Sequence, residues 1–122
     1  MNNFEELEAW KLARALRKEV AVLVAKFPPE EKYRLTDQIL RSSLSVTANI
    51  AEGYGRFHYQ ENIQFCRQAR GSITETLDHL ICAFDNTYID EKSLHDFRVK
   101  INHTIKVLNG YIAYLKKRKE ES

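Results

Sequence analysis

Two cysteines and four histidines are the residues with which this chain could bind a metal ion or carry redox chemistry. Cys66 and Cys82 lie 16 residues apart in a segment predicted to form one helix, which separates them by about 24 Å along its axis. That separation excludes a disulfide or a shared metal ion, and Cys66 is interpreted as a small core residue. A di-iron bundle needs two Glu-x-x-His pairs, and the sequence has none. Glu75 and His79 have the spacing of a surface pair, so we expect no metal site.

Nucleophilic catalysis and phosphate-loop chemistry require glycine patterns that are missing from the sequence. There is no Gly-x-Ser-x-Gly elbow and no Gly-x-x-x-x-Gly-Lys loop, and Gly53 with Gly55 lacks the third glycine of a dinucleotide-binding turn. The serines Ser42, Ser43 and Ser45 are interpreted as small residues that allow close helix packing. We therefore expect no cofactor and a protein that is not an enzyme.

Basic side chains gather in two segments, where they could contact the phosphates of a nucleic acid. Three lie on one outward face of a predicted first helix and four end a predicted last helix, and we expect antiparallel packing to join them into one patch. Residues 54–59 (Tyr-Gly-Arg-Phe-His-Tyr) could stack on exposed bases. Alternatively, the Lys-rich helix end only complements the helix dipole and is solvated. The candidate nucleic-acid-binding residues are Lys11, Arg14, Lys18, Arg56, Lys116, Lys117, Arg118 and Lys119.

Asn49, Glu52 and Arg56 lie around the glycine pair and allow two interpretations. They could form a recognition site on the rim of an assembly. They could also satisfy free backbone groups and pair with one another at the end of a helix. The second interpretation is favoured, because a defined turn between helices needs such groups anyway.

Length and composition indicate the size and class of the protein that carries these residues. A chain of 122 residues is the size of one domain, and 30% charged with 43% hydrophobic residues is ordinary soluble usage. The absence of a long apolar run or a leader-like start predicts a cytoplasmic protein with no membrane segment. The net charge of +2 is uneven, since residues 91–122 carry eight basic and four acidic side chains.

Three breaks divide the chain into four segments with helical periodicity. The breaks are Phe27-Pro28-Pro29, Gly53-Tyr54-Gly55 and residues 85–90. We predict helices at about 4–26, 30–53, 58–85 and 91–118, with capping boxes at Asn3 and at Ser93. Because the links are short, the predicted fold is all-α: a single-domain, up-down-up-down four-helix bundle.

The apolar residues exceed what one bundle core needs. In the last segment, Leu94, Ile101, Leu108 and Leu115 recur every seven residues and define a core stripe. The second segment instead carries two apolar stripes that together cover about half of the helix circumference. In the first segment, some apolar residues lie off the main apolar stripe of that segment. Imperfect helix geometry would account for this, but a subunit interface accounts for it better. The predicted interface residues are Phe4, Leu7, Trp10, Leu40, Leu44 and the mid-helix Gly71.

Residues 38–56 (Gln-Ile-Leu-Arg-Ser-Ser-Leu-Ser-Val-Thr-Ala-Asn-Ile-Ala-Glu-Gly-Tyr-Gly-Arg) carry the most distinctive motif. This motif resembles the signature of the small four-helix-bundle proteins encoded in intervening sequences of bacterial 23S rRNA genes. Residues 7–13, 27–33 and 65–75 resemble further motifs of that family, so the resemblance covers most of the chain. The family-motif residues are Arg41, Asn49, Glu52, Gly53, Arg56 and Gly71.

The resemblance implies a bacterial helical bundle that assembles into a ring, commonly a homopentamer, without known catalytic activity. The family is similar in fold to the accessory proteins of diversity-generating retroelements, which bind nucleic acid. We therefore expect a non-enzymatic, ring-forming protein that binds RNA or DNA through basic patches on its rim. The alternative is a protein-interaction scaffold or adaptor, serving a partner encoded nearby, that binds no nucleic acid.

Overall fold

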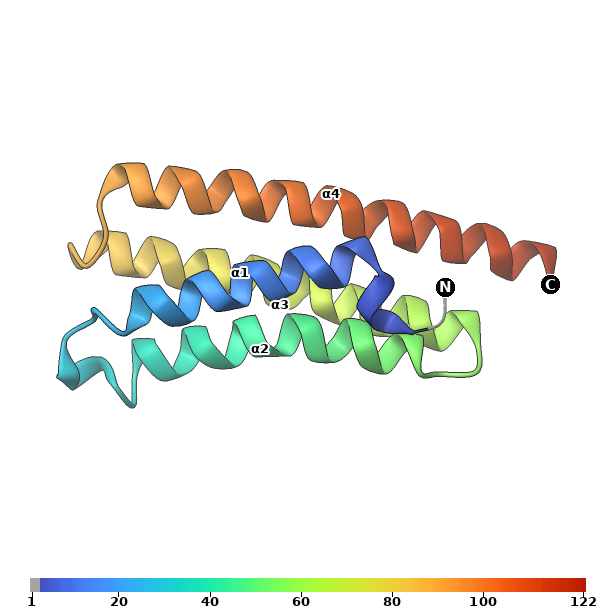
Figure 1. The fold of residues 1–122 in the computed structure, drawn as a ribbon, viewed down its shortest axis with the longest axis horizontal. Helices are drawn as coiled ribbons and strands as arrows, with labels where there is room; N and C mark the ends of the chain where they lie inside the picture. The colour runs from blue at the N-terminus through green and yellow to red at the C-terminus, as the bar shows by residue number, and fades with distance from the viewer. Residues whose placement is uncertain (1–2) are drawn as a thin grey trace.

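Four long helices run in alternating directions through residues 3–122, the part of the chain that the computed structural model describes (Figure 1). They are α1 (Glu8–Val24), α2 (Leu35–Tyr54), α3 (Tyr59–Asp85) and α4 (Glu91–Glu121). Two 3-10 helices, η1 (Phe4–Glu6) and η2 (Pro29–Glu31), precede α1 and α2. Each long helix packs against two others, in the cyclic order α1, α2, α3, α4. The described residues contain no strand, and the predicted all-α four-helix bundle is confirmed.

The core follows the predicted periodicity most closely in α4, where Leu94, Ile101, Leu108 and Leu115 are all buried. In α1, Ala13 and Val24 are buried, whereas Leu12 and Leu23 are only half-buried. Phe84 is exposed near the end of α3. Among the described residues, no helix has the length and apolarity needed to cross a membrane.

The first segment is not one helix over 4–26 as predicted. Asn3 caps η1 by accepting a hydrogen bond from the Glu5 N–H at 2.8 Å. Leu7 then adopts an extended backbone, and α1 starts at Glu8. At this break between η1 and α1 the Leu7 side chain lies in the core, where it is only 4% exposed. The expectation that Leu7 lies off the core is therefore wrong, because it assumed an unbroken helix through this position.

The second segment also begins differently, and Glu31 ties the turn before α2 to the turn between α3 and α4 at the same end of the bundle. Its carboxylate accepts hydrogen bonds from the Tyr88 hydroxyl at 2.6 Å and from the Leu35 N–H at 3.4 Å. Arg34, whose backbone is not helical, separates η2 from α2. The helix therefore spans 35–54 rather than the predicted 30–53.

The turn between α3 and α4 closes the same end of the bundle. Thr87 has φ = 64°, and the N–H groups of Thr87 and Tyr88 donate to the carbonyls of Phe84 and Ala83, which is a Schellman motif. Asp90 caps α4 by accepting from the Ser93 N–H at 2.8 Å, so the cap predicted at Ser93 lies three residues earlier. The helix continues to Glu121 rather than 118, and in Figure 1 its C-terminal turns extend past the other helices.

Small residues line the contact between α2 and α3, which we call the α2–α3 seam. The hydroxyls of Ser42 and Thr76 lie 2.8 Å apart, and Ser72 donates to Ser45 at 3.1 Å. At Gly53 the approach is closest: an added Cβ would lie 2.7 Å from Asn62 Oδ1 and 2.8 Å from the Cβ of Phe65. The seam consists of Ser42, Ser45, Asn49 and Gly53 of α2 and Asn62, Phe65, Ser72 and Thr76 of α3.

Gly53→Ala should lower the free energy of unfolding by about 1–3 kcal/mol, because the extra methyl group would force α2 and α3 apart. Gly110→Ala is the matched control, since an added Cβ there meets nothing within 4 Å. That variant should gain up to about 1 kcal/mol from higher helix propensity. Urea denaturation measures both. A Gly53→Ala protein as stable as the unmodified chain would contradict the close approach.

Tyr88→Phe should lower stability at pH 7 and have a smaller effect in acid. The Tyr88 hydroxyl bond is the main reason that the pKa of Glu31 lies below its ordinary value. A carboxyl with a lowered folded pKa stabilises the fold above its unfolded pKa of about 4.3, and this contribution is lost as the pH falls through the folded value. Urea midpoints at pH 7 and pH 3 measure the effect, with the exposed Tyr33→Phe as control. An equal loss at both pH values would contradict this assignment.

Candidate nucleic-acid interface

The basic C-terminal turns of α4 lie beside the first turn of α3. Lys116, Lys117, Arg118 and Lys119 are all exposed. Lys119 Nζ donates to Gln60 Oε1 at 2.5 Å, and a hydrogen bond with the Tyr59 side chain raises the pKa of Arg118. These two contacts bring the predicted cationic cluster against the predicted aromatic and basic segment, residues 54–59.

The basic residues of α1 do not join that cluster. The ion pair between Glu19 and Lys100 sets the register of α1 against α4. Counting from this pair at 1.5 Å per residue, Lys11 lies level with residue 108 and Lys18 with residue 101. Lys116 is therefore about 12 Å beyond Lys11 along the bundle, and about 22 Å beyond Lys18. Lys11 and Lys18 are thus set back from the C-terminal cluster along the bundle axis.

Arg14 makes a local contact with the Trp10 ring. Its guanidinium lies 5.6 Å from the centroid of the Trp10 ring, and the Trp10 ring meets the Phe4 ring edge-on at 5.2 Å. Phe4 and Trp10 are half-buried against the core. They therefore cover the start of α1 rather than forming a freely exposed apolar surface.

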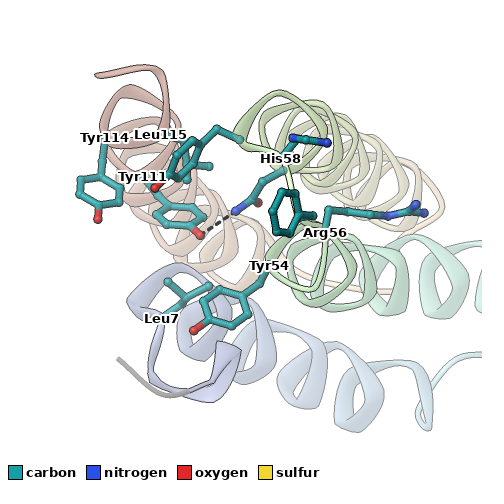
Figure 2. Close-up of a pocket in the computed structure, with 10 residues that line it drawn as sticks. Leu7, Tyr54, Arg56, His58, Tyr111, Tyr114 and Leu115 are labelled. Atoms are coloured by element: carbon teal, nitrogen blue, oxygen red, sulfur yellow. Dashed lines mark hydrogen bonds between the residues drawn. The ribbon is translucent and has the colours of Figure 1, made fainter. Parts of the chain in front are cut away.

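Arg56 links the end of α2 to the start of α3. Its guanidinium lies 4.8 Å from the Phe65 ring centroid, 3.5 Å from Glu52 and 3.6 Å from Glu61. Figure 2 shows it pointing away from Tyr111 and Tyr114. Two carboxylates thus offset the charge of Arg56, which supports the structural interpretation of Glu52 and Arg56.

The other family-motif residues in α2 also make local contacts. Asn49 Nδ2 donates to the backbone carbonyl and the hydroxyl of Ser45, both at 2.9 Å. Arg41 pairs with Asp37 at 2.9 Å on the exposed surface, and Gly53 allows the closest contact of the α2–α3 seam. Gly53 therefore serves the α2–α3 contact, whereas Arg41 and Asn49 make contacts within α2.

A partly open cavity of about 700 Å³ lies at this end of the bundle, and we call it the tyrosine pocket (Figure 2). Its walls come from the chain just before α1, from α2, α3 and α4, and from the turn between α2 and α3. Segment 54–59 supplies one side, as a stacking site would require. The lining residues are Leu7, Tyr54, Arg56, Phe57, His58, Tyr59, Asn62, Tyr111, Tyr114 and Leu115.

The tyrosine pocket has polar but uncharged groups at its base. Asn62 is buried and donates through Nδ2 to the Tyr111 hydroxyl at 3.1 Å, and the Cys66 thiol donates to Asn62 Oδ1 at 3.6 Å. Burial raises the pKa of Tyr111 to about 12 and that of Cys66 to about 11. Both groups are neutral at pH 7, so they can donate hydrogen bonds but supply no thiolate or phenolate nucleophile.

Sequence reasoning assigned Asn62, Tyr111, Tyr114 and Leu115 to no binding site, and it placed Leu7 in a subunit interface. Tyr111 and Tyr114 are spaced by three residues near a basic helix end, which is the only sequence signal that relates them to segment 54–59. Cys66 is a buried core residue, as predicted, and Glu75 pairs with His79 on the surface at 3.0 Å. Within residues 3–122, no cluster of three His, Cys, Asp or Glu side chains could hold a metal ion.

Three of the predicted interface residues are exposed in the single chain. Leu40 and Leu44 present apolar side chains on the outer face of α2, and Gly71 is exposed on α3. An added Cβ at Gly71 would meet nothing within 4 Å, so packing inside this chain does not require glycine there.

Comparison with known proteins identifies one family. No curated protein matches the chain. The family model for the 23S rRNA-intervening sequence protein matches residues 5–110. That range contains the α2–α3 seam and every family-motif residue, and it ends just before Tyr111. Because the match spans most of the chain, and the chain folds as the four-helix bundle that its motif predicts, the chain belongs to the 23S rRNA-intervening sequence protein family.

Proposed function

We propose that this protein is a non-enzymatic, self-associating bundle of the bacterial cytoplasm that binds nucleic acid at its aromatic-basic end, defined as residues 54–59 with 116–119. The observation that carries this proposal is the pair of contacts from Lys119 to Gln60 and from Arg118 to Tyr59. They bring two of the four consecutive cations beside an aromatic segment whose Phe57 is 93% exposed.

The chemistry of this end suits a nucleic-acid strand. Lysine and arginine side chains neutralise phosphates, and exposed aromatic rings stack on bases. An exposed phenylalanine beside a cationic helix end provides both kinds of contact over a short distance. Lys11 and Lys18 of α1 are set back from this end along the bundle, and Arg56 is already paired with two carboxylates.

A protein-interaction scaffold without nucleic-acid binding is the second candidate. It is favoured by the exposed Leu40 and Leu44 on α2 and by the open space around Gly71. These residues support self-association in either case. In a cyclic ring each subunit contributes two different patches, and the resemblance of the sequence motifs suggests five subunits. A partner encoded nearby would bind such an assembly.

Binding to single-stranded RNA should weaken steeply as salt rises, since phosphate contacts release counterions. Replacing Lys116, Lys117 and Lys119 with Gln should make the slope of log K against log salt less negative by about 2 for a single strand. The matched control replaces three exposed basic residues elsewhere, Lys26, Arg98 and Lys106. Fluorescence anisotropy with a labelled strand measures all three proteins.

The control variant should keep the slope of the unmodified protein. Equal slopes for both triple variants would mean that the strand does not bind at the end of α4. No binding at low salt by the unmodified protein would favour the scaffold instead.

Leu44→Asp should lower the mass of the protein in solution, because it places a charge in the proposed subunit interface. Leu44 is 56% exposed, so its substitution should change the stability of a single chain by no more than about 0.5 kcal/mol. Val99→Asp on α4 is the matched control, with a starting exposure of 55%. Light scattering at micromolar concentration measures the mass. An unmodified protein with the 14.3 kDa mass of one chain would contradict self-association.

A further inference from the structure

The tyrosine pocket is shaped for a flat, uncharged, partly polar group. Tyr54, Tyr111 and Tyr114 come from α2 and α4, and Figure 2 shows their rings around the cavity with Leu7 beside Tyr54. A volume of about 700 Å³ lies within the usual range for small-ligand sites, about 300–1,000 Å³. The guanidinium of Arg56 is turned away from the tyrosines, and the groups at the base are neutral.

The base of the pocket also offers hydrogen bonds to the edge of a ligand. Asn62 uses one of its two Nδ2 hydrogens on Tyr111, and a primary amide nitrogen carries two. The hydroxyl of a neutral tyrosine can donate as well as accept. A nucleobase has donors and acceptors on its edge and flat faces that stack on aromatic rings.

A second hollow of about 500 Å³ adjoins the tyrosine pocket and contains the cation that a nucleotide would need. Phe57, His58 and Tyr59 line both hollows, and Lys119 and Gln60 line only the second. The shared aromatic wall therefore separates an uncharged cavity from one with a lysine at its side. In a nucleotide, the base is likewise uncharged and the phosphate attached to its sugar is charged, so the base would suit the tyrosine pocket and the phosphate the hollow with Lys119.

We propose that the tyrosine pocket binds one unpaired nucleobase of a single strand, with an adjoining phosphate held in the hollow that contains Lys119. This inference rests on the proposed function and adds the feature that is recognised. Stacking needs a free base face, and in a duplex both faces are already covered by neighbouring base pairs. The protein should therefore prefer single strands or unpaired ends to continuous duplex.

The test compares three labelled DNA probes of twelve nucleotides: a single strand, the matching duplex, and an abasic strand with the same number of phosphates. The abasic strand keeps every phosphate contact and removes every base. The unmodified protein should bind the normal strand roughly 5- to 100-fold more tightly than the abasic strand, the range for stacking of one base on aromatic side chains. It should bind the duplex more weakly than the normal strand.

Tyr114→Ala locates the base. Tyr114 is 55% exposed, so its removal should leave the fold intact, and circular dichroism checks this. The variant should lose most of the preference for the normal over the abasic strand while it retains the salt dependence of both. Tyr33→Ala removes an 83% exposed tyrosine from the segment between η2 and α2 and should keep the preference. Phe57→Ala is a second pocket variant in an exposed turn and should also reduce the preference.

The outcomes separate the two proposals. Salt-dependent binding with equal affinity for the normal and abasic strands would leave the proposed function standing and overturn the base site. A base preference that Tyr114→Ala and Phe57→Ala both retain would also overturn the base site, since the base would then bind elsewhere. No binding of any probe at low salt would overturn the proposed function and the inference with it.

Discussion

Gly53 allows α2 and α3 to approach until a single added methyl group would lie within 3 Å of atoms of Asn62 and Phe65. Farther along the seam, two hydroxyl pairs, Ser45 with Ser72 and Ser42 with Thr76, also join the two helices. The same approach fixes Asn62, which bonds Tyr111 and so positions α4 at the base of the tyrosine pocket. It also brings Arg56 over Phe65 and between two carboxylates. Gly53 is thus needed for the packing of α2 on α3, and the position of Asn62 at the base of the pocket depends on that packing.

The two ends of the bundle are built in opposite ways. At one end a buried carboxylate, Glu31, binds the Tyr88 hydroxyl and joins the turn before α2 to the turn after α3, with the Phe27 and Tyr88 rings 5.4 Å apart. At the other end the tyrosines surround a cavity, and α4 extends beyond its neighbours with four cations. This second end offers a partner both a cavity and a run of four cations.

The spacing of apolar residues predicted the four helices and the α4 core well. Each helix of a bundle buries one face, and this leaves a pattern in the sequence of that helix alone. It did not predict the break at Leu7 or the late start of α2. Those depend on contacts distant in sequence, such as that of Glu31 with Tyr88. The candidate site shows the same contrast between local patterns and distant contacts. Segment 54–59 is a local run of aromatic and basic residues, and the sequence predicted it as part of the site. Tyr111 and Tyr114 reach the pocket only through the register of α4, and that register also separates Lys11 and Lys18 from the C-terminal cations.

Trp10 is the one tryptophan of the chain, and it lies at the start of α1, between the Phe4 ring and the guanidinium of Arg14. Tryptophan emission therefore reports the packing of η1 on α1. It does not report the contact of Glu31 with Tyr88, which lies at the other end of the bundle. A fluorescence change that precedes the loss of helical circular dichroism on heating would indicate local fraying of the first residues. Coincident curves would show that η1 unfolds together with the bundle.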